Sequence, residues 1–218
     1  MSAPLILLSC SLIVAALAAT GSAQSLAEIA AEAKRKKQES TRPVLTNEEM
    51  PSAASFPGIQ LLGETSNAPS LAPYVPTPMP VVEAMLELAE VGKDEVVFDI
   101  GSGDGRIVIA AAEHFGAFGV GIEIDSDLVA RSRKTIEEKG LTERVRIIHG
   151  NALDVDLGAA DVVTLYLTPD GLSLLRPHFE RTLRPGTTVV SHDYAIPGWT
   201  PVEERRVMGR DLFLYRAP

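Results

Sequence analysis

Three glycines occur within five residues, at Gly101, Gly103 and Gly105, between a β-branched apolar run (residues 96–100) and a helical segment (residues 106–114). Glycine allows the chain to turn sharply and lets its backbone approach a ligand, and the N–H groups at the helix start then face that ligand. This stretch therefore predicts a strand, a ligand-binding loop and a helix in succession, which is how an α/β unit begins.

The alternation of strand and helix continues through the rest of the chain. A helical stretch at residues 81–89 precedes the loop, and short β-branched runs, typical of strands covered on both faces, follow it. Besides residues 96–100, the predicted strands are residues 119–124, 145–148, 162–167 and 188–190, and the other predicted helices are residues 126–139 and 171–183. This order predicts a doubly wound α/β fold with a mostly parallel sheet and right-handed crossovers.

Two strand-like runs at the end of the chain break this alternation. Residues 202–207 and 212–215 are separated only by residues 208–211, so no helix fits between them. We therefore predict a C-terminal antiparallel hairpin at the edge of the sheet, in place of the sixth parallel strand of an ordinary dinucleotide-binding fold.

The N-terminal region contains an almost unbroken apolar run at residues 5–19, which is short for a membrane-spanning helix and typical of a signal peptide. Small residues at 21–23 offer a cleavage site, which favours export. The first basic residues, at 34–37, instead favour an uncleaved anchor that leaves the rest of the chain in the cytoplasm. We predict that residues 1–23 are a signal peptide or membrane anchor, and both alternatives stay open.

The segment after this run differs in composition from the rest of the chain. Proline, serine, asparagine and glycine are scattered through much of it with little periodicity, and such a segment buries too little apolar surface to offset its chain entropy. We therefore predict that residues 24–70 are a mobile linker and that residues 71–218 form the folded domain.

The overall charge argues against one large class of partner. The chain has a net charge of −9 and a pI near 5.0, whereas nucleic-acid binding needs a positive surface that neutralises phosphates. The single cysteine, Cys10, lies in the apolar N-terminal run, which leaves the predicted domain without thiols for a disulfide or a thiolate zinc site. We expect no nucleic-acid partner and no bound metal.

The charges in the glycine loop distinguish between two kinds of ligand. A dinucleotide site has the spacing G-x-G-x-x-G, but here the third glycine falls one place early and Arg106 stands at the required position. Asp99 precedes the first glycine and Asp104 lies inside the loop, and both carboxylates would repel a pyrophosphate. Because they suit a cationic amino group, we predict a ligand that joins an amino-acid cation to a nucleoside.

Polar side chains also follow the next two predicted strands. Glu123 lies 20 residues beyond Gly103, where a carboxylate can accept hydrogen bonds from both hydroxyls of a ribose. We interpret Asp125 as the N-cap of the helix that follows. After the third strand, Asn151 or a neighbouring backbone amide is placed to contact an adenine edge, although asparagine is also common in turns.

Together these motifs resemble the seven-strand, class I S-adenosylmethionine-dependent methyltransferases. The similarity is greater to the mitochondrial protein-lysine methyltransferases that modify the ADP/ATP translocase and ATP synthase subunit c, and to their bacterial relatives. It extends from Pro73 to the C-terminus, and its most discriminating parts are the Tyr-Val-Pro-Thr segment and the Val-Ser-His and Gly-Trp segments. The matching stretches are residues 73–78, 98–106, 121–125, 165–167, 183–192 and 198–199.

The resemblance implies a Rossmann-like methyltransferase fold and S-adenosyl-L-methionine as the methyl donor. It also implies that the acceptor is a lysine of a protein, which can be a membrane protein. The predicted donor-binding residues are Tyr74, Thr77, Asp99, Gly101, Ser102, Gly103, Asp104, Glu123 and Asn151. Tyr74 and Thr77 are expected to fold over the donor as a lid, or to form only a proline-stiffened entry loop. Tyr166 is the candidate catalytic residue, because its hydroxyl could hydrogen-bond the acceptor amine. The alternative is that Tyr166 only packs, half-buried, beside the strand with its hydroxyl in water.

Three other polar or aromatic residues have competing interpretations. His192, after the fifth strand, is a candidate base, although a lone histidine is more often structural. Asp161 precedes the fourth strand, at the end of the sheet away from the predicted site, so we interpret it as structural. Trp199 either packs along the substrate channel or fills the core under the hairpin.

Other functions remain as alternatives. A methyltransferase that acts on a small molecule or a lipid would have the same donor site, and so would a protein that binds the donor without turnover. A nicotinamide-dependent oxidoreductase is the least favoured alternative because of the glycine spacing. Nothing rich in arginine near the N-terminus indicates mitochondrial import, so the resemblance does not carry over the mitochondrial substrates.

Overall fold

The structure, a computed structural model, describes residues 71–218. The predicted signal or anchor segment at residues 1–23 and the predicted linker at residues 24–70 lie outside the described residues. Within the described part of the chain, no helix is both long and apolar enough to cross a membrane.

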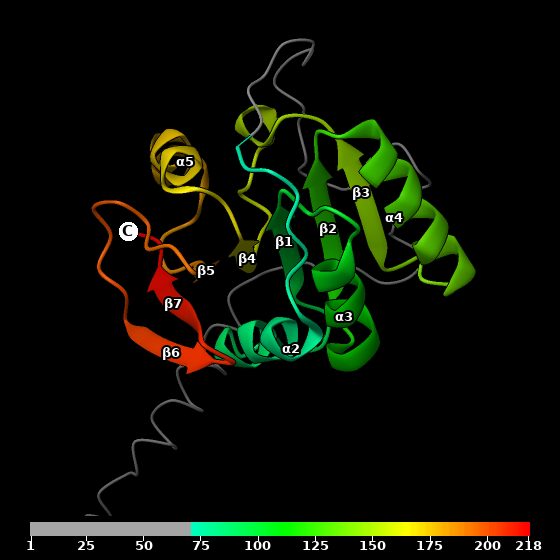
Figure 1. Cartoon of the computed structure of the whole chain (residues 1–218), viewed down its shortest axis with the longest axis horizontal. Coiled ribbons are helices and arrows are strands. Elements are labelled where there is room, and N and C mark those ends of the chain that lie inside the picture. The colour runs from blue at the N-terminus through cyan, green and yellow to red at the C-terminus, as the bar shows by residue number, and fades with distance from the viewer. Residues whose placement is uncertain (1–70) are drawn as a thin grey trace, which may run out of the picture. The chain divides into compact units, whose positions relative to one another are not determined.

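Seven strands form one sheet in the order β3-β2-β1-β4-β5-β7-β6 (Figure 1). The strands are β1 (Val96–Ile100), β2 (Phe118–Glu123), β3 (Val145–His149), β4 (Val162–Leu165), β5 (Thr188–His192), β6 (Glu203–Val207) and β7 (Arg210–Arg216). Strands β1 to β5 pair in parallel, whereas β7 pairs antiparallel to both β5 and β6. The predicted doubly wound, mostly parallel fold with an antiparallel C-terminal hairpin is therefore confirmed.

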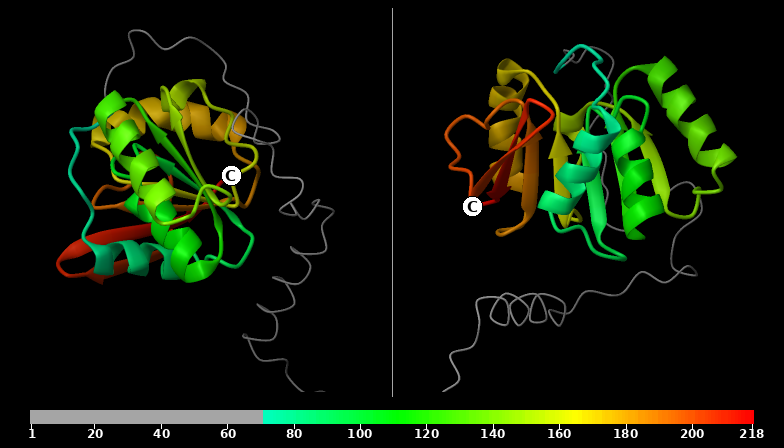
Figure 2. Two further views of the ribbon diagram at one scale, coloured as in Figure 1. Left: turned by 90° about the vertical axis from the view of Figure 1, so that its right-hand side faces the viewer. Right: turned by 60° about the horizontal axis from the view of Figure 1, so that its bottom comes forward.

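Helices cover both faces of this sheet (Figure 2). They are α2 (Met79–Leu88), α3 (Arg106–Phe115), α4 (Ser126–Glu138), the short 3₁₀ helix η1 (Ala152–Asp154) and α5 (Pro169–Thr182). Val97 of β1 faces the core that contains α2 and α3, whereas its neighbour Phe98 faces the core that contains α5. This alternation follows from the two-residue period of a strand and assigns every strand residue to one face or the other.

Local signals in the sequence determine where the helices begin. The Asp125 side chain accepts hydrogen bonds from the backbone N–H groups of Asp127 and Leu128, so Asp125 caps α4 as predicted. The Thr168 side chain caps α5 in the same way, and Pro169 occupies the first turn of that helix. This cap explains why β4 ends at Leu165, two residues before the predicted end. Tyr166 and Leu167 therefore leave the sheet and become available to the loop above it.

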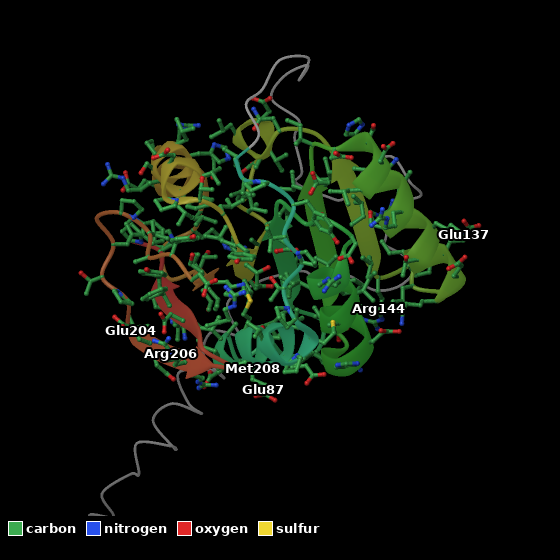
Figure 3. The ribbon with its side chains drawn as sticks, viewed as in Figure 1. Glu87, Glu137, Arg144, Glu204, Arg206 and Met208 are labelled. Carbon is green, nitrogen blue, oxygen red and sulfur yellow. The ribbon has the colours of Figure 1, made fainter. Side chains whose placement is uncertain are left out.

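The C-terminal hairpin turns more tightly than predicted. Met208 and Gly209 both have positive φ, of 52° and 78°, and form the turn alone. Arg210 and Asp211, predicted to belong to the turn, are paired in β7 with Val207 and Arg206 of β6. Two residues with positive φ match the right-handed twist of the flanking strands, which favours the shorter turn. The Met208 side chain lies exposed at the hairpin tip (Figure 3).

Close contact between α3 and β2 holds the helix start above the end of β1. A Cβ atom added to Gly119 of β2 would lie 2.7 Å from the carbonyl oxygen of Val108 in α3. That oxygen belongs to the helix backbone and has no freedom to rotate away. We expect Gly119→Ala to lower the free energy of unfolding by about 1–3 kcal/mol, because the side chain overpacks this contact.

Urea denaturation of the wild type and of Gly119→Ala would measure this change in the free energy of unfolding. Gly92→Ala is the matched control, because its added Cβ would make only ordinary contacts of 3.7 Å or more with the flexible Glu95 side chain. An unchanged midpoint for Gly119→Ala, or an equal loss in both variants, would show that the α3–β2 contact does not limit stability.

Candidate functional site

A cavity of about 530 Å³ lies at the carboxyl ends of β1, β2 and β4. Its volume is within the range of small-molecule sites. Its walls are the segment at residues 71–77, the glycine loop, the end of β2 and the residues that follow β3 and β4. The segment at residues 71–77 is called the entry segment below; in Figure 1 it is the cyan trace that precedes α2. All nine predicted donor-binding residues, and Tyr166, line this cavity.

The glycine loop brings its backbone directly against the entry segment. Gly103 has a φ of 56°, and a Cβ added to it would lie 2.6 Å from the ring of Tyr74. Glycine is therefore required at this position both by backbone conformation and by the aromatic side chain above it. The Ser102 hydroxyl beside it is buried against Gly121 of β2 and has no hydrogen-bond partner among the described residues.

Asp99 is buried at the base of the cavity, and its side chain is 3% exposed. Its neighbour across the β1–β4 ladder is Thr164, whose hydroxyl donates a 2.7 Å hydrogen bond to the Asp99 carboxylate. Burial raises the pKa of Asp99 from 3.8 to about 7, the hydrogen bond from Thr164 opposes this rise, and the charges of Glu123 and Asp104 add to it. Near neutral pH this site therefore favours a ligand that brings a positive charge.

Glu123 connects the end of β2 to the glycine loop. One carboxylate oxygen accepts a 2.7 Å hydrogen bond from the backbone N–H of Gly103. The other accepts hydrogen bonds of 2.8 and 2.9 Å from the N–H groups of Ile124 and Asp125. These bonds fix the carboxylate at the cavity wall, and the oxygen that accepts from Gly103 keeps a further lone pair for a hydroxyl donor.

The structure assigns Asp104 a different partner from the one that the sequence suggested. Two hydrogen bonds, of 2.8 and 2.6 Å, join its carboxylate to the guanidinium of Arg106. Burial acts to raise the pKa of Asp104, but the contacts with Arg106 outweigh it and the pKa is lowered. Asp104 is therefore an ion-paired part of the loop that also lines the cavity, and its contact with a ligand stays a prediction.

The entry segment is attached to the rest of the site at several points. Arg106 donates a 2.8 Å hydrogen bond to the carbonyl oxygen of Thr77, and the Tyr74 hydroxyl interacts with Asp104. The Thr77 hydroxyl lies 3.3 Å from Nδ1 of His192, which ends β5. The segment is therefore fixed at the wall of the cavity, a position that fits both the predicted lid and the proline-stiffened entry loop.

Asn151 reaches the cavity, but its side chain already has a role. Its carboxamide oxygen accepts a hydrogen bond from the N–H of Leu153 and caps η1. Any contact with a nucleobase is therefore left to the amide nitrogen of the side chain or to the backbone of this turn. The sequence placed the residue at the site, but its capping role was not predicted.

Asp161 and Trp199 both lie away from the chemistry. The Asp161 carboxylate accepts a hydrogen bond from the N–H of Val96 and pairs with Arg184, at the opposite end of the sheet from the cavity. Trp199 packs against Phe179 and Tyr215 under the hairpin, so it belongs to the core and not to a substrate channel.

Tyr166 and His192 stand together beside the cavity. Their ring centroids are 3.9 Å apart, and His192 is fully buried. Burial lowers the pKa of His192, an effect that Asp193 partly opposes, so the imidazole is neutral at physiological pH. Sequence reasoning identified both residues but missed Asp193 beside them, as well as the roles of Thr164 beside Asp99 and of Arg106 beside Asp104. Thr164 could have been found as the one polar residue within the apolar run of β4.

The buried carboxyl group of Asp99 gives the site a testable pH dependence. The folded protein holds a proton on Asp99 at pH values where the unfolded chain has released it, between 3.8 and about 7. Stability therefore falls as the pH rises through this range, by an amount on the order of 4 kcal/mol. We expect Asp99→Asn to match the wild type near pH 4 and to be more stable at pH 8.

Urea denaturation at several pH values would check this expectation. His178 and His192 have lowered pKa values, so they cause stability to rise with pH below about 6.5 in both proteins. The difference between Asp99→Asn and the wild type removes that shared contribution. A difference that stays constant from pH 4 to pH 8 would contradict the raised pKa of Asp99.

Comparisons with known proteins place this site in a family. A family model described as the ANTKMT methyltransferase domain matches residues 99–203. A protein-lysine N-methyltransferase of Saccharolobus islandicus is 44% identical over 148 residues, which cover 66% of this chain and 92% of that protein. The adenine nucleotide translocase lysine N-methyltransferase of mouse is 33% identical over 60% of this chain. The chain spans about half the length of that relative, 56%.

A solved structure agrees with these relatives. The crystal structure of an RNA methyltransferase from Salinibacter ruber in complex with S-adenosyl-L-homocysteine has a TM-score of 0.65 and 48% sequence identity, and covers 66% of this chain and 94% of that one. The seven-strand sheet, the glycine loop with its acids and the relatives agree with one another. The chain therefore belongs to the family of S-adenosylmethionine-dependent methyltransferases that the ANTKMT domain model describes.

Proposed function

We propose that this methyltransferase transfers a methyl group to the side-chain amine of a lysine in a protein. The observation that carries the proposal is the distribution of charge in the cavity. Arg106 neutralises Asp104, whereas Asp99 and Glu123 stay directed at the cavity and suit a cationic donor rather than a phosphate chain. The similarity to the Saccharolobus protein-lysine methyltransferase supports the choice of acceptor.

The residues that line the cavity fit S-adenosylmethionine. Asp99 is the partner for the amino group of its methionine part, and Glu123 for the hydroxyls of its ribose. The backbone of the glycine loop, which lines the cavity, adds hydrogen-bonding groups on the same side. Tyr74 and Thr77 of the entry segment cover the donor, and the turn at Asn151 borders its base.

The chemistry requires little beyond positioning. The nitrogen lone pair of the acceptor forms a bond to the methyl carbon while the carbon–sulfur bond breaks, and that electron pair stays on sulfur, which becomes neutral. A lysine with a pKa of about 10.4 must first release a proton to solvent, since only the free amine has a lone pair. Desolvation of the amine on binding lowers that pKa and increases the reactive fraction, whereas any ionised carboxylate close to the amine acts in the opposite direction.

The charge of the protein also favours a lysine acceptor over RNA. The RNA methyltransferase from Salinibacter ruber makes RNA the second candidate acceptor. A net charge of −9 repels the phosphate backbone and attracts basic protein surfaces. A lipid or small-molecule acceptor remains a further alternative, because the donor half of the site would be the same.

Labelled donor distinguishes these acceptors in one experiment. The full-length protein is incubated with methyl-labelled S-adenosylmethionine and, separately, with a single-lysine peptide, a cellular protein extract, total RNA or lipid vesicles. We expect label in the protein and peptide fractions, at lysine by mass spectrometry, because the negatively charged protein attracts basic protein surfaces and repels RNA. Label confined to RNA or lipid would overturn the proposed acceptor.

Two variants connect the result to the site. Glu123→Gln places an NH₂ group against backbone N–H donors, so we expect donor affinity to fall by about tenfold or more in calorimetry. Glu143→Gln, which changes an exposed acid outside the cavity, is the matched control and should bind like the wild type. Donor binding without transfer to any fraction would indicate a binding protein without turnover.

We further propose that residues 1–23 hold the protein at a membrane with the methyltransferase domain on the cytoplasmic side. The apolar run at residues 5–19 and the basic residues at 34–37 support this orientation. The donor is made in the cytoplasm, and an exported domain would be separated from it.

Reporter fusions in a bacterial host test this orientation. With the reporter at the C-terminus of the full-length chain, a fluorescent protein active only in the cytoplasm should fluoresce in the membrane fraction, whereas alkaline phosphatase should be inactive. Replacing the basic residues at 34–37 by glutamine should weaken this preference. Active phosphatase with a cleaved N-terminus would show export instead.

A further inference from the structure

The turn after β5 contains an acidic residue with a positive φ, Asp193, which has no part in the proposed binding of the donor. Asp193 adopts a φ of 62°, which is uncommon for residues other than glycine. Strand β7 holds it there: the N–H of Asp193 donates a 2.7 Å hydrogen bond to the carbonyl of Asp211, whose own N–H donates to the Asp193 carboxylate at 3.3 Å. This turn sets Asp193 directly after His192, the residue that packs against Tyr166 at the cavity.

The Asp193 carboxylate is fixed between a cation and a phenol. Arg210 donates a 2.7 Å hydrogen bond to one carboxylate oxygen. Tyr166 lies close to the same carboxylate, because its ring packs against His192, whose Nε2 is 3.6 Å from Asp193. Asp193 raises the pKa of the Tyr166 phenol. A carboxylate accepts hydrogen bonds and has none to donate, so Tyr166 is the only possible donor between the two groups.

His192 keeps the Tyr166 ring in this position. The two rings are stacked, and His192 is itself fixed by Thr77 of the entry segment. Nε2 of His192 lies 3.6 Å from the Asp193 carboxylate, too far for a hydrogen bond. The charged and titratable groups around the phenol are thus Asp193, Arg210, His192 and the neighbouring Tyr194.

We propose that Asp193, held by Arg210, is a positioning residue that orients the Tyr166 hydroxyl so that its oxygen accepts a hydrogen bond from the acceptor amine. The inference rests on the proposed function, because it requires an amine at this end of the cavity. A neutral amine has N–H groups and one lone pair. Donating an N–H to Tyr166 leaves that lone pair directed at the methyl carbon. A freely rotating phenol would instead donate its proton to the nitrogen and block the attack.

The arrangement itself is testable without any acceptor. Burial raises the pKa of Tyr166, Asp193 raises it further, and Arg210 opposes them. Asp193→Gly, which suits the positive φ, should lower the Tyr166 pKa, whereas Arg210→Gln should raise it. The Tyr166 phenol is titrated by its absorbance. For each protein, the titration curve of the same protein with Tyr166→Phe added is subtracted, which removes the contribution of the other tyrosines. Equal values in all backgrounds would overturn the Asp193–Tyr166 contact.

Kinetics with a single-lysine peptide test the positioning role. We expect Tyr166→Phe and Asp193→Gly each to lower kcat by about tenfold, and the double variant to lose no more than either single one, because both changes remove the same hydrogen bond. Asp193→Asn keeps an acceptor oxygen and tolerates positive φ, so it should retain most activity. Donor affinity should be unchanged in all of them.

The outcomes separate this inference from the proposed function. Additive losses in the double variant, or a loss in Asp193→Gly that is explained by weaker donor binding, would overturn the positioning role while leaving lysine methylation intact. If the wild-type protein methylates no lysine, the proposed function fails and the amine role of Tyr166 fails with it. In that case the titration still decides whether Asp193 orients the phenol.

Discussion

The burial of one carboxyl group, Asp99, at the end of the central strand is the constraint on which the site depends. Strand β1 lies between β2 and β4, so its end is enclosed by neighbours and its side chains lose contact with water. The hydrogen bond from Thr164 compensates only part of this loss, and the pKa of Asp99 stays near 7. A ligand cation stabilises the ionised form, so the fold itself creates the preference for such a ligand.

Two acids of the glycine loop, Asp99 and Asp104, look alike in the sequence but have different partners in the structure. Asp104 forms an ion pair with Arg106, and that pair in turn holds the entry segment through the carbonyl of Thr77. Asp99 has no such role in the lid and stays directed at the cavity. Spacing along the chain does not reveal which of the two is paired, because the pairing depends on a side-chain conformation selected by the entry segment. This is why the sequence identified the loop but not the pairing of Asp104 with Arg106.

Much of the fold and the donor half of the site could be predicted because both follow from local patterns. β-branched runs, caps such as Asp125 and the glycine loop each act within a few residues of chain. The acceptor half depends on contacts between distant segments. His192 meets Thr77 across 115 residues, and Arg210 meets Asp193 only because β7 pairs with β5. The two-residue turn of the hairpin sets that pairing, and the predicted four-residue turn would have taken Arg210 out of the strand.

The alternation of side chains along the strands explains how both halves come to face one cavity. Asp99, Thr164 and Val190 occupy matching positions in β1, β4 and β5, on the face covered by α2 and α3. His192 stands two residues after Val190 in β5, which directs it to the same face, and Tyr166, which follows β4, packs against its ring. The entry segment reaches that face because it leads into α2. The groups proposed to bind donor and acceptor are therefore brought together by strand period and topology, and Thr77 connects them through its contacts with Arg106 and His192.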